Sequence, residues 1–82
     1  MSSEFRKLRG ERMQLKQDLK TLEIRADNHI INIRNKIDPL LDFDEIEIDH
    51  AEQSVISLKV IITEAKKIRE RLDKISKLIG DE

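Results

Sequence analysis

Residues 49–80 read DHAEQSVISLKVIITEAKKIRERLDKISKLIG, and this stretch decides the fold. Its apolar side chains recur every three or four residues, which is the period of an α-helix and not the alternation of a β-strand. Residues 55–62 are rich in β-branched side chains and, taken alone, are typical of a strand. Because the helical spacing continues from Ala51 to Ile79, the stretch as a whole predicts a helix.

The two ends of this stretch carry helix-capping residues. Asp49 suits the N-cap position, and Glu52, three residues later, completes the pattern of a capping box. Gly80 stands where a left-handed C-terminal cap is expected. We therefore expect this helix to cover about residues 50–79.

A second apolar stripe runs from Phe5 to Leu40, one residue past Pro39, the only proline of the chain. Its members are Phe5, Leu8, Leu15, Leu19, Leu22, Ala26, Ile30, Ile33, Ile37 and Leu40. Most of them are three or four residues apart, which again is helical spacing. Two successive four-residue steps, at Ala26 and Ile30, break the seven-residue repeat of coiled coils. The stripe predicts a first helix at about residues 4–37.

Pro39 sets the end of the first helix, because a proline disfavours the helical conformation of the residue before it, Asp38. Alternatively, Asp38 caps a short new turn with Pro39 at its first position. In both interpretations the chain changes direction here, and the turn covers about residues 38–49.

The similar lengths of the two helices and their short connection favour an antiparallel hairpin. In that register Ala26 lies near Ile61 and Ile62, so that apolar residues face one another. The expected fold class is all-α: residues 1–82 form a single domain, an antiparallel two-helix hairpin of coiled-coil type.

The chain has 82 residues, and a lone hydrophobic core of this size is only marginally stable. Small proteins usually add disulfides, a metal or oligomerisation. The absence of cysteine removes disulfides, thiolate chemistry and cysteine-ligated zinc, which leaves oligomerisation as the common route. A charged fraction of 40% combined with periodic aliphatic residues is typical of long, exposed helices.

The sequence predicts no membrane span, because it contains no run of about 18 apolar residues. Met1 is followed by polar and charged residues and not by an apolar stretch of the signal-peptide type. We therefore expect a small cytoplasmic protein that begins with its own initiator methionine.

The middle of each predicted helix has more apolar residues than a two-stranded seam requires. Adjacent isoleucines, such as Ile30 with Ile31, point about 100° apart on a helix, so one hairpin covers only one of them. Exposed apolar patches of several hundred Å² usually mark interfaces, and we expect the hairpin to dimerise into a four-helix bundle. The residues expected to mediate self-association are Ile30, Ile31, Ile33, Val55, Ile56, Leu58, Ile61 and Ile62.

The alternative to self-association is a monomer in which the connecting segment folds back over the apolar patch. The residues available for this are Leu40, Leu41, Phe43, Ile46 and Ile48. A monomer of this kind would hide its aliphatic residues without a partner.

The charges are segregated along the chain, although the net charge is only −1. Residues 38–53 carry seven acids and no Lys or Arg, whereas residues 1–37 carry nine bases and five acids. The seven acids are Asp38, Asp42, Asp44, Glu45, Glu47, Asp49 and Glu52. Acids near the start of the second helix suit its dipole. In an antiparallel dimer they would also set the acidic turn of one copy near the basic end of the other.

Two further surfaces are candidates for partners. The basic end that carries both termini is a candidate site for nucleic acid, and its contact residues would be Arg6, Lys7, Arg9, Lys74 and Lys77. Acids alternate with these bases, and Trp and Tyr are absent, so stacking platforms for bases are lacking. The turn is a candidate docking site for a basic partner protein, and its contact residues would be Phe43, Asp44, Glu45, Ile46, Glu47 and Ile48.

The acidic turn is also the only place where a metal site is conceivable. It lacks the glycine that an EF-hand loop needs, so we expect a solvated turn with at most weak divalent-cation binding. Glu47 and His50 match the Glu-x-x-His pattern of di-iron bundles, but that site requires a second such pair and further glutamates. No metal or other cofactor is therefore expected.

His29 occupies a position on the apolar stripe between Phe5 and Leu40, with Asn28 and Asn32 nearby. We expect a structural polar residue in an interface, where it can fix register or oligomeric state. A pH-sensing role through titration of the imidazole is the alternative.

The sequence contains no Gly-rich phosphate loop and no recognisable nucleophile pattern. It predicts a protein that is not an enzyme and that binds itself and another protein, as an adaptor, scaffold or regulatory subunit. A nucleic-acid-binding accessory protein that uses the basic end is the alternative function.

Overall fold

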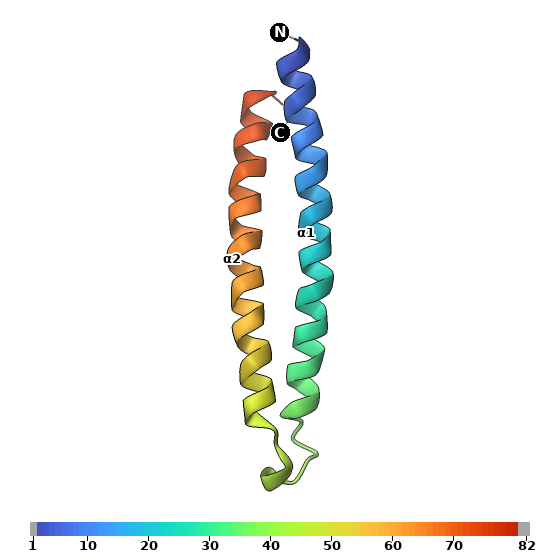
Figure 1. Ribbon diagram of the computed structural model, residues 1–82, viewed down its shortest axis with the longest axis vertical. Helices are drawn as coiled ribbons and strands as arrows, with labels where there is room; N and C mark the ends of the chain where they lie inside the picture. Colours follow the sequence, from blue (N-terminus) through green and yellow to red (C-terminus); the bar gives the residue numbers. More distant parts are fainter. Residues whose placement is uncertain (1, 81–82) are drawn as a thin grey trace.

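The computed structural model describes residues 2–80 of the chain. Three elements follow one another: α1 (Ser2–Lys36), the 3-10 turn η1 (Phe43–Glu45) and α2 (Ile48–Leu78). Within residues 2–80 there is no strand, so the prediction of an all-helical fold is confirmed. Figure 1 shows α1 and α2 packed side by side in opposite directions, with η1 at the far end from the chain termini. The rod measures 63 × 17 × 15 Å.

The start of α2 corrects the predicted capping. The helix begins at Ile48 with Glu47 in the N-cap position, and Glu47 makes no side-chain capping hydrogen bond. Its Oε2 atom instead lies 2.6 Å from Nζ of Lys36, the last residue of α1. Asp49 is therefore not the N-cap but lies inside the first turn, where its charge still suits the positive end of the helix dipole.

The reversal between the helices is built on Asp38. Its Oδ1 atom accepts a 2.9 Å hydrogen bond from the N–H of Leu40, and its carbonyl accepts a 3.0 Å bond from the N–H of Leu41. Proline is well suited to the second position of such a turn because its φ is already fixed. Both interpretations of this segment therefore apply: the helix ends before Pro39, and Asp38 caps a new turn.

The core is a narrow seam between α1 and α2. Its buried residues are Leu22, Ala51, Ser54, Ile61 and Ile75. A two-helix rod has no third layer to cover the sides of the helices that face away from this seam.

Beyond Ala26, the expected stripe on α1 is wrong at Ile30 and Ile37, while Ile33 between them is half-buried as expected. Ile30 and Ile37 were expected to face α2, yet both are exposed. His29 and Lys36, seven and fourteen residues after the buried Leu22, are half-buried instead. The seven-residue repeat of Leu22 continues, so that His29 and Lys36 occupy the seam near the turn, whereas Ile30 and Ile37 lie outside it.

Polar side-chain contacts link the two arms of the hairpin at several levels. Glu11 pairs with Arg71 towards the termini, Asn32 with Ser54 nearer the turn, and Lys36, the last residue of α1, with Glu47, the N-cap of α2. These pairs fit one antiparallel register. Neither helix, within the part of the chain that the structure describes, has a segment apolar and long enough to traverse a bilayer.

Candidate interaction surface

An open groove runs between the two helices on one long side of the rod. Its lining residues are Lys16, Leu19, Lys20, Leu22, Glu23, Ala26, Ile61, Ile62, Ala65 and Arg69. Ala26, Ile61 and Ile62 meet here, as the predicted antiparallel register requires. The middle of the groove is aliphatic, and its charged residues lie on the flanks and towards the termini.

The same side continues towards the turn as a band of large aliphatic residues. Residues seven apart in a helix lie within about 20° of one another around its axis. Ile30 and Ile37 follow Glu23 at this interval, and Val55 and Ile48 precede Ile62 at the same interval. We call this band the apolar face, and its members are Ile30, Ile37, Ile48, Val55 and Ile62.

The apolar face is open to solvent in the single chain. The side chains of its five members are between 40% and 58% exposed. Scattered exposed aliphatic residues are normal on protein surfaces, but contiguous patches usually mark interfaces. Here both helices contribute to one continuous band, so a flat partner surface can contact all five residues at once.

The opposite long side of the rod is polar. One groove there is lined by Asp18, Thr21 and Glu64 together with Leu22 and Ile68. A second, nearer the turn, is lined by Asn32, Asp49, His50, Glu52, Gln53 and Ser54. The hairpin is thus amphipathic as a whole, with one side rich in aliphatic residues and the other rich in polar ones.

The predicted self-association residues fall into three structural groups. Ile61, at 2% exposure, is buried between the helices, and Ile33 and Leu58 are half-buried in the same seam. These three residues hold the hairpin together and present little surface to another copy. The members that lie on the apolar face are Ile30, Val55 and Ile62.

Ile31 and Ile56 form the third group and point away from the seam. Ile31 is nine residues from the buried Leu22, which is half a turn around α1 at 100° per residue. Ile56 follows the buried Ser54 by two residues and so lies on the outer side of α2. Both residues are exposed, but on the backs of the two helices and not on the apolar face.

Ile37 and Ile48 were not among the residues expected to mediate self-association. The available signal was the seven-residue interval from Ile30 to Ile37 and from Val55 back to Ile48. In the connecting segment, Leu40, Phe43 and Ile48 are exposed, whereas Leu41 and Ile46 are half-buried. The members of the apolar face remain 40–58% exposed, so the segment does not cover them as the monomeric alternative requires.

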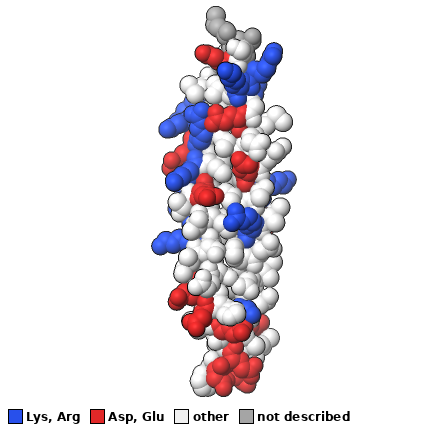
Figure 2. Space-filling model, in the orientation of Figure 1, with Lys and Arg blue, Asp and Glu red and all other residues white. Residues whose placement is uncertain are grey.

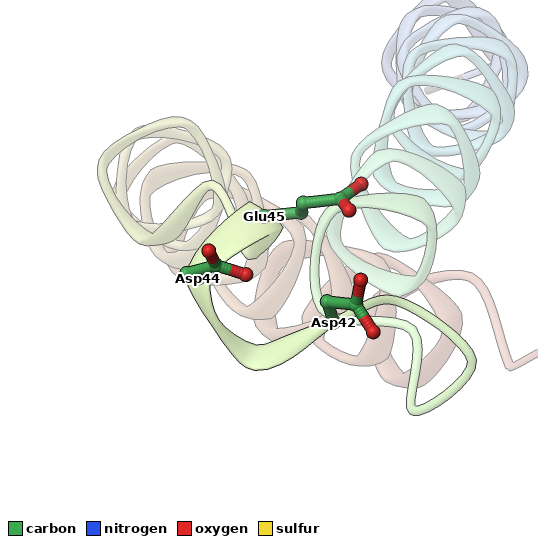
Figure 3. Close-up of side chains that lie close together, drawn as sticks. All are labelled: Asp42, Asp44 and Glu45. Atoms are coloured by element: carbon green, nitrogen blue, oxygen red, sulfur yellow. The ribbon is translucent and has the colours of Figure 1, made fainter.

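The turn end of the rod is an acidic tip. Asp42, Asp44 and Glu45 each place one carboxylate oxygen within 4.8 Å of the others, as Figure 3 illustrates. The N–H of Glu45 donates a 2.8 Å hydrogen bond to the carbonyl of Asp42, which folds the segment into η1. All three carboxylates are exposed, and water satisfies such groups well, so the cluster does not by itself define a metal site.

The residues proposed for partner docking at the turn lie around this tip. Phe43, Asp44, Glu45, Glu47 and Ile48 are exposed. Ile46 is half-buried. Figure 2 shows acidic side chains covering the turn end, while Lys and Arg side chains occur mainly along the rest of the rod.

The basic end has mixed charge. Its five predicted nucleic-acid contacts are all exposed: Arg6, Lys7, Arg9, Lys74 and Lys77. Close to them, Nε and Nη2 of Arg71 donate to the two carboxylate oxygens of Glu11 at 2.6 and 2.9 Å. The hydrogen bond from Arg71 lowers the pKa of Glu11, and the same bond raises the pKa of Arg71. Part of the basic charge is thus already paired within the hairpin.

Comparison of the chain with protein-family models, with curated proteins and with solved structures found no match. No relative therefore indicates a ligand or partner for these surfaces. A proposal about function rests on the apolar face, the acidic tip and the basic side chains described above.

Proposed function

We propose that this chain is a non-enzymatic protein–protein interaction module that first binds a second copy of itself. In this proposal two hairpins form a four-helix bundle, and the dimer acts as an adaptor, scaffold or regulatory subunit. The observation that carries the proposal is the apolar face, a band of five large aliphatic side chains that their own chain leaves uncovered.

Physical considerations of size support self-association. A rod 17 × 15 Å across has one seam and no room for a second layer of core. Chains of this size commonly gain the missing burial by oligomerisation. A second hairpin placed on the apolar face supplies the missing layer and converts two seams into one core.

The same dimensions argue against catalysis. Substrate pockets are concave and enclose most of a small ligand. A two-helix rod offers open grooves along its sides, and the aliphatic groove adjoins the apolar face at Ile62. A flat partner surface fits this shape better than a small molecule does.

The test is the absolute mass in solution, measured by light scattering after size exclusion at two loading concentrations. We expect about twice the chain mass of 9.7 kDa at both. The adjacent residues Val55 and Ile56 provide matched variants, since they are 49% and 52% exposed but lie on different sides of α2. Val55→Asp should give a monomer, whereas Ile56→Asp should remain dimeric.

Circular dichroism of both variants checks that the helices are retained. A wild-type monomer at both concentrations would overturn the proposal. Equal dissociation by the two folded variants would show that the apolar face is not the contact surface.

A further inference from the structure

The apolar face occupies only the half of the rod next to the turn. Ile37 and Ile48 flank the turn itself, and Ile30 and Val55 mark the centre of the band. Beyond Ile62, the groove on the same side becomes basic. We call Lys16, Lys20 and Arg69 the basic collar, since these three line the groove there with Glu23 as the one acid among them.

The basic collar and the acidic tip lie at similar distances from the centre of the apolar face. Lys20 and Lys16 precede Ile30 by ten and fourteen residues, which is about 15 to 21 Å at 1.5 Å per residue. In the other direction α1 ends about 9 Å beyond Ile30, and the tip projects roughly another 11 Å within the 63 Å rod. The exposed carboxylates of Asp42, Asp44 and Glu45 are therefore about 15 to 20 Å from the same centre.

From this arrangement, and resting on the proposed self-association, we infer the geometry of the dimer. We propose that two hairpins pair antiparallel and offset, related by a twofold axis near Ile30 and Val55. The apolar faces of the two turn-proximal halves then overlap completely. Each acidic tip lies against the basic collar of the other copy.

Charge selects this geometry over a parallel dimer. Parallel pairing also overlaps the apolar faces, but it brings two acidic tips together, each with the carboxylates of Asp42, Asp44 and Glu45. Like charges in contact are unfavourable, whereas opposite charges at the edge of an interface steer and orient association.

The short extent of the apolar face favours the offset antiparallel dimer over an antiparallel dimer with full overlap. If the two antiparallel rods lay side by side over their whole length, the apolar half of each copy would lie against the charged half of the other. The offset pairing instead shares a footprint of about 40 Å by 17 Å, or about 700 Å² per copy. Stable complexes bury about 800 Å² per partner, so this overlap is of sufficient size.

Cysteine cross-linking tests the geometry cleanly, because the chain contains no cysteine. Val55→Cys reports that the apolar faces meet, since Val55 lies near the axis in either orientation. Lys20→Cys mixed with Glu45→Cys reports the antiparallel offset pair. Glu45→Cys alone reports the parallel pair, and Ile56→Cys on the back of α2 is the control.

On mild oxidation we expect disulfide dimers from Val55→Cys and mixed dimers from Lys20→Cys with Glu45→Cys. We expect few dimers from Glu45→Cys or Ile56→Cys alone. Efficient cross-linking of Glu45→Cys with itself would overturn the antiparallel geometry while leaving self-association intact, as would Val55→Cys dimers without the mixed product. A monomeric mass and no Val55→Cys dimer would overturn the proposed function as well.

Discussion

Asn32 of α1 donates a hydrogen bond from its Nδ2 atom to the Oγ atom of Ser54 in α2, and the two atoms lie 2.5 Å apart. Ser54 is only 6% exposed, so the bond is formed in the seam and partly out of contact with water. A buried polar group that loses its partner retains the cost of its desolvation. Sliding one helix by a turn would break this bond, so the pair specifies the register of the hairpin.

Replacing Ser54 by Ala should therefore destabilise the hairpin. The change removes the acceptor of Asn32 and should lower the free energy of unfolding by about 1–2 kcal/mol. Urea unfolding followed by circular dichroism measures this difference. Ser57→Ala, one turn along the same helix, leaves the bond intact and should change the stability by less than about 0.5 kcal/mol. Equal effects of the two substitutions would contradict a register role for Ser54.

The two glycines should respond to alanine in opposite directions. Gly10 lies inside α1, and a Cβ atom there would meet nothing within 4 Å. Gly10→Ala should stabilise the helix by about 1 kcal/mol, because glycine is a poor helix former. Gly80, just past the end of α2, has φ +69°, a conformation that costs alanine about 1–2 kcal/mol. Thermal midpoints should rise for the first variant and fall for the second, by about 4–8 °C per kcal/mol.

Substitutions at the neighbouring residues Ile61 and Ile62 should distinguish effects on folding from effects on dimerisation. Ile61 is buried in the seam, so Ile61→Ala should cost about 2–5 kcal/mol of hairpin stability. Ile62 lies on the apolar face, so Ile62→Ala should mainly weaken the dimer. In a monomeric Val55→Asp background, urea titration should show the loss for Ile61→Ala and little change for Ile62→Ala. A similar loss for both would place Ile62 in the core of the single hairpin.

Acid should destabilise the hairpin through two carboxylates. Hydrogen bonds from Arg71 and Lys36 lower the pKa of Glu11 and Glu47, respectively, below the ordinary value of 4.5. A group with a lowered pKa in the folded state contributes stability above about pH 4.5, and that contribution is lost as the pH falls through the folded value.

The matched variants for this effect are Glu11→Gln and Glu47→Gln. Each should reduce the fall in thermal midpoint between pH 7 and pH 3. About 1 M salt, where the screening length is about 3 Å, should weaken the wild-type contribution at neutral pH. An unchanged pH profile in both variants would show that the two pairs contribute nothing.

The helical period was sufficient to predict the all-helical fold and both helix boundaries to within two residues. It was not sufficient to decide which side of α1 faces α2. Leu22, Ala26, Ile30 and Ile37 form one helical stripe, and Leu22, Ala26, His29 and Lys36 form another that fits equally well. The second stripe is the one that faces α2. Polar contacts form there near the turn, such as Asn32 with Ser54 and Lys36 with Glu47, and these contacts depend on the three-dimensional register of the two helices.

The sequence predicted that exposed isoleucines and valines form an interaction surface, but not which of them lie on the same side of the hairpin. Spacing within one helix identifies residues that share a side of that helix, such as Ile30 and Ile37. It does not indicate which side of α2 lies next to them, because that depends on how each helix is rotated about the seam. For the same reason Ile61 was grouped with its neighbour Ile62, although only Ile62 is available to a partner.

Because the hairpin is a rod, the length of the dimer distinguishes the antiparallel offset geometry from the parallel one. A single hairpin is 63 Å long with a radius of gyration of 18.3 Å. Two hairpins that share only their turn-proximal halves would span about 85 Å, since each adds an unshared arm of roughly 20 Å. The radius of gyration from X-ray scattering would rise accordingly, while a parallel dimer would grow mainly in thickness. The chain ends of an offset dimer emerge at opposite extremities, so it would hold whatever is attached to them far apart.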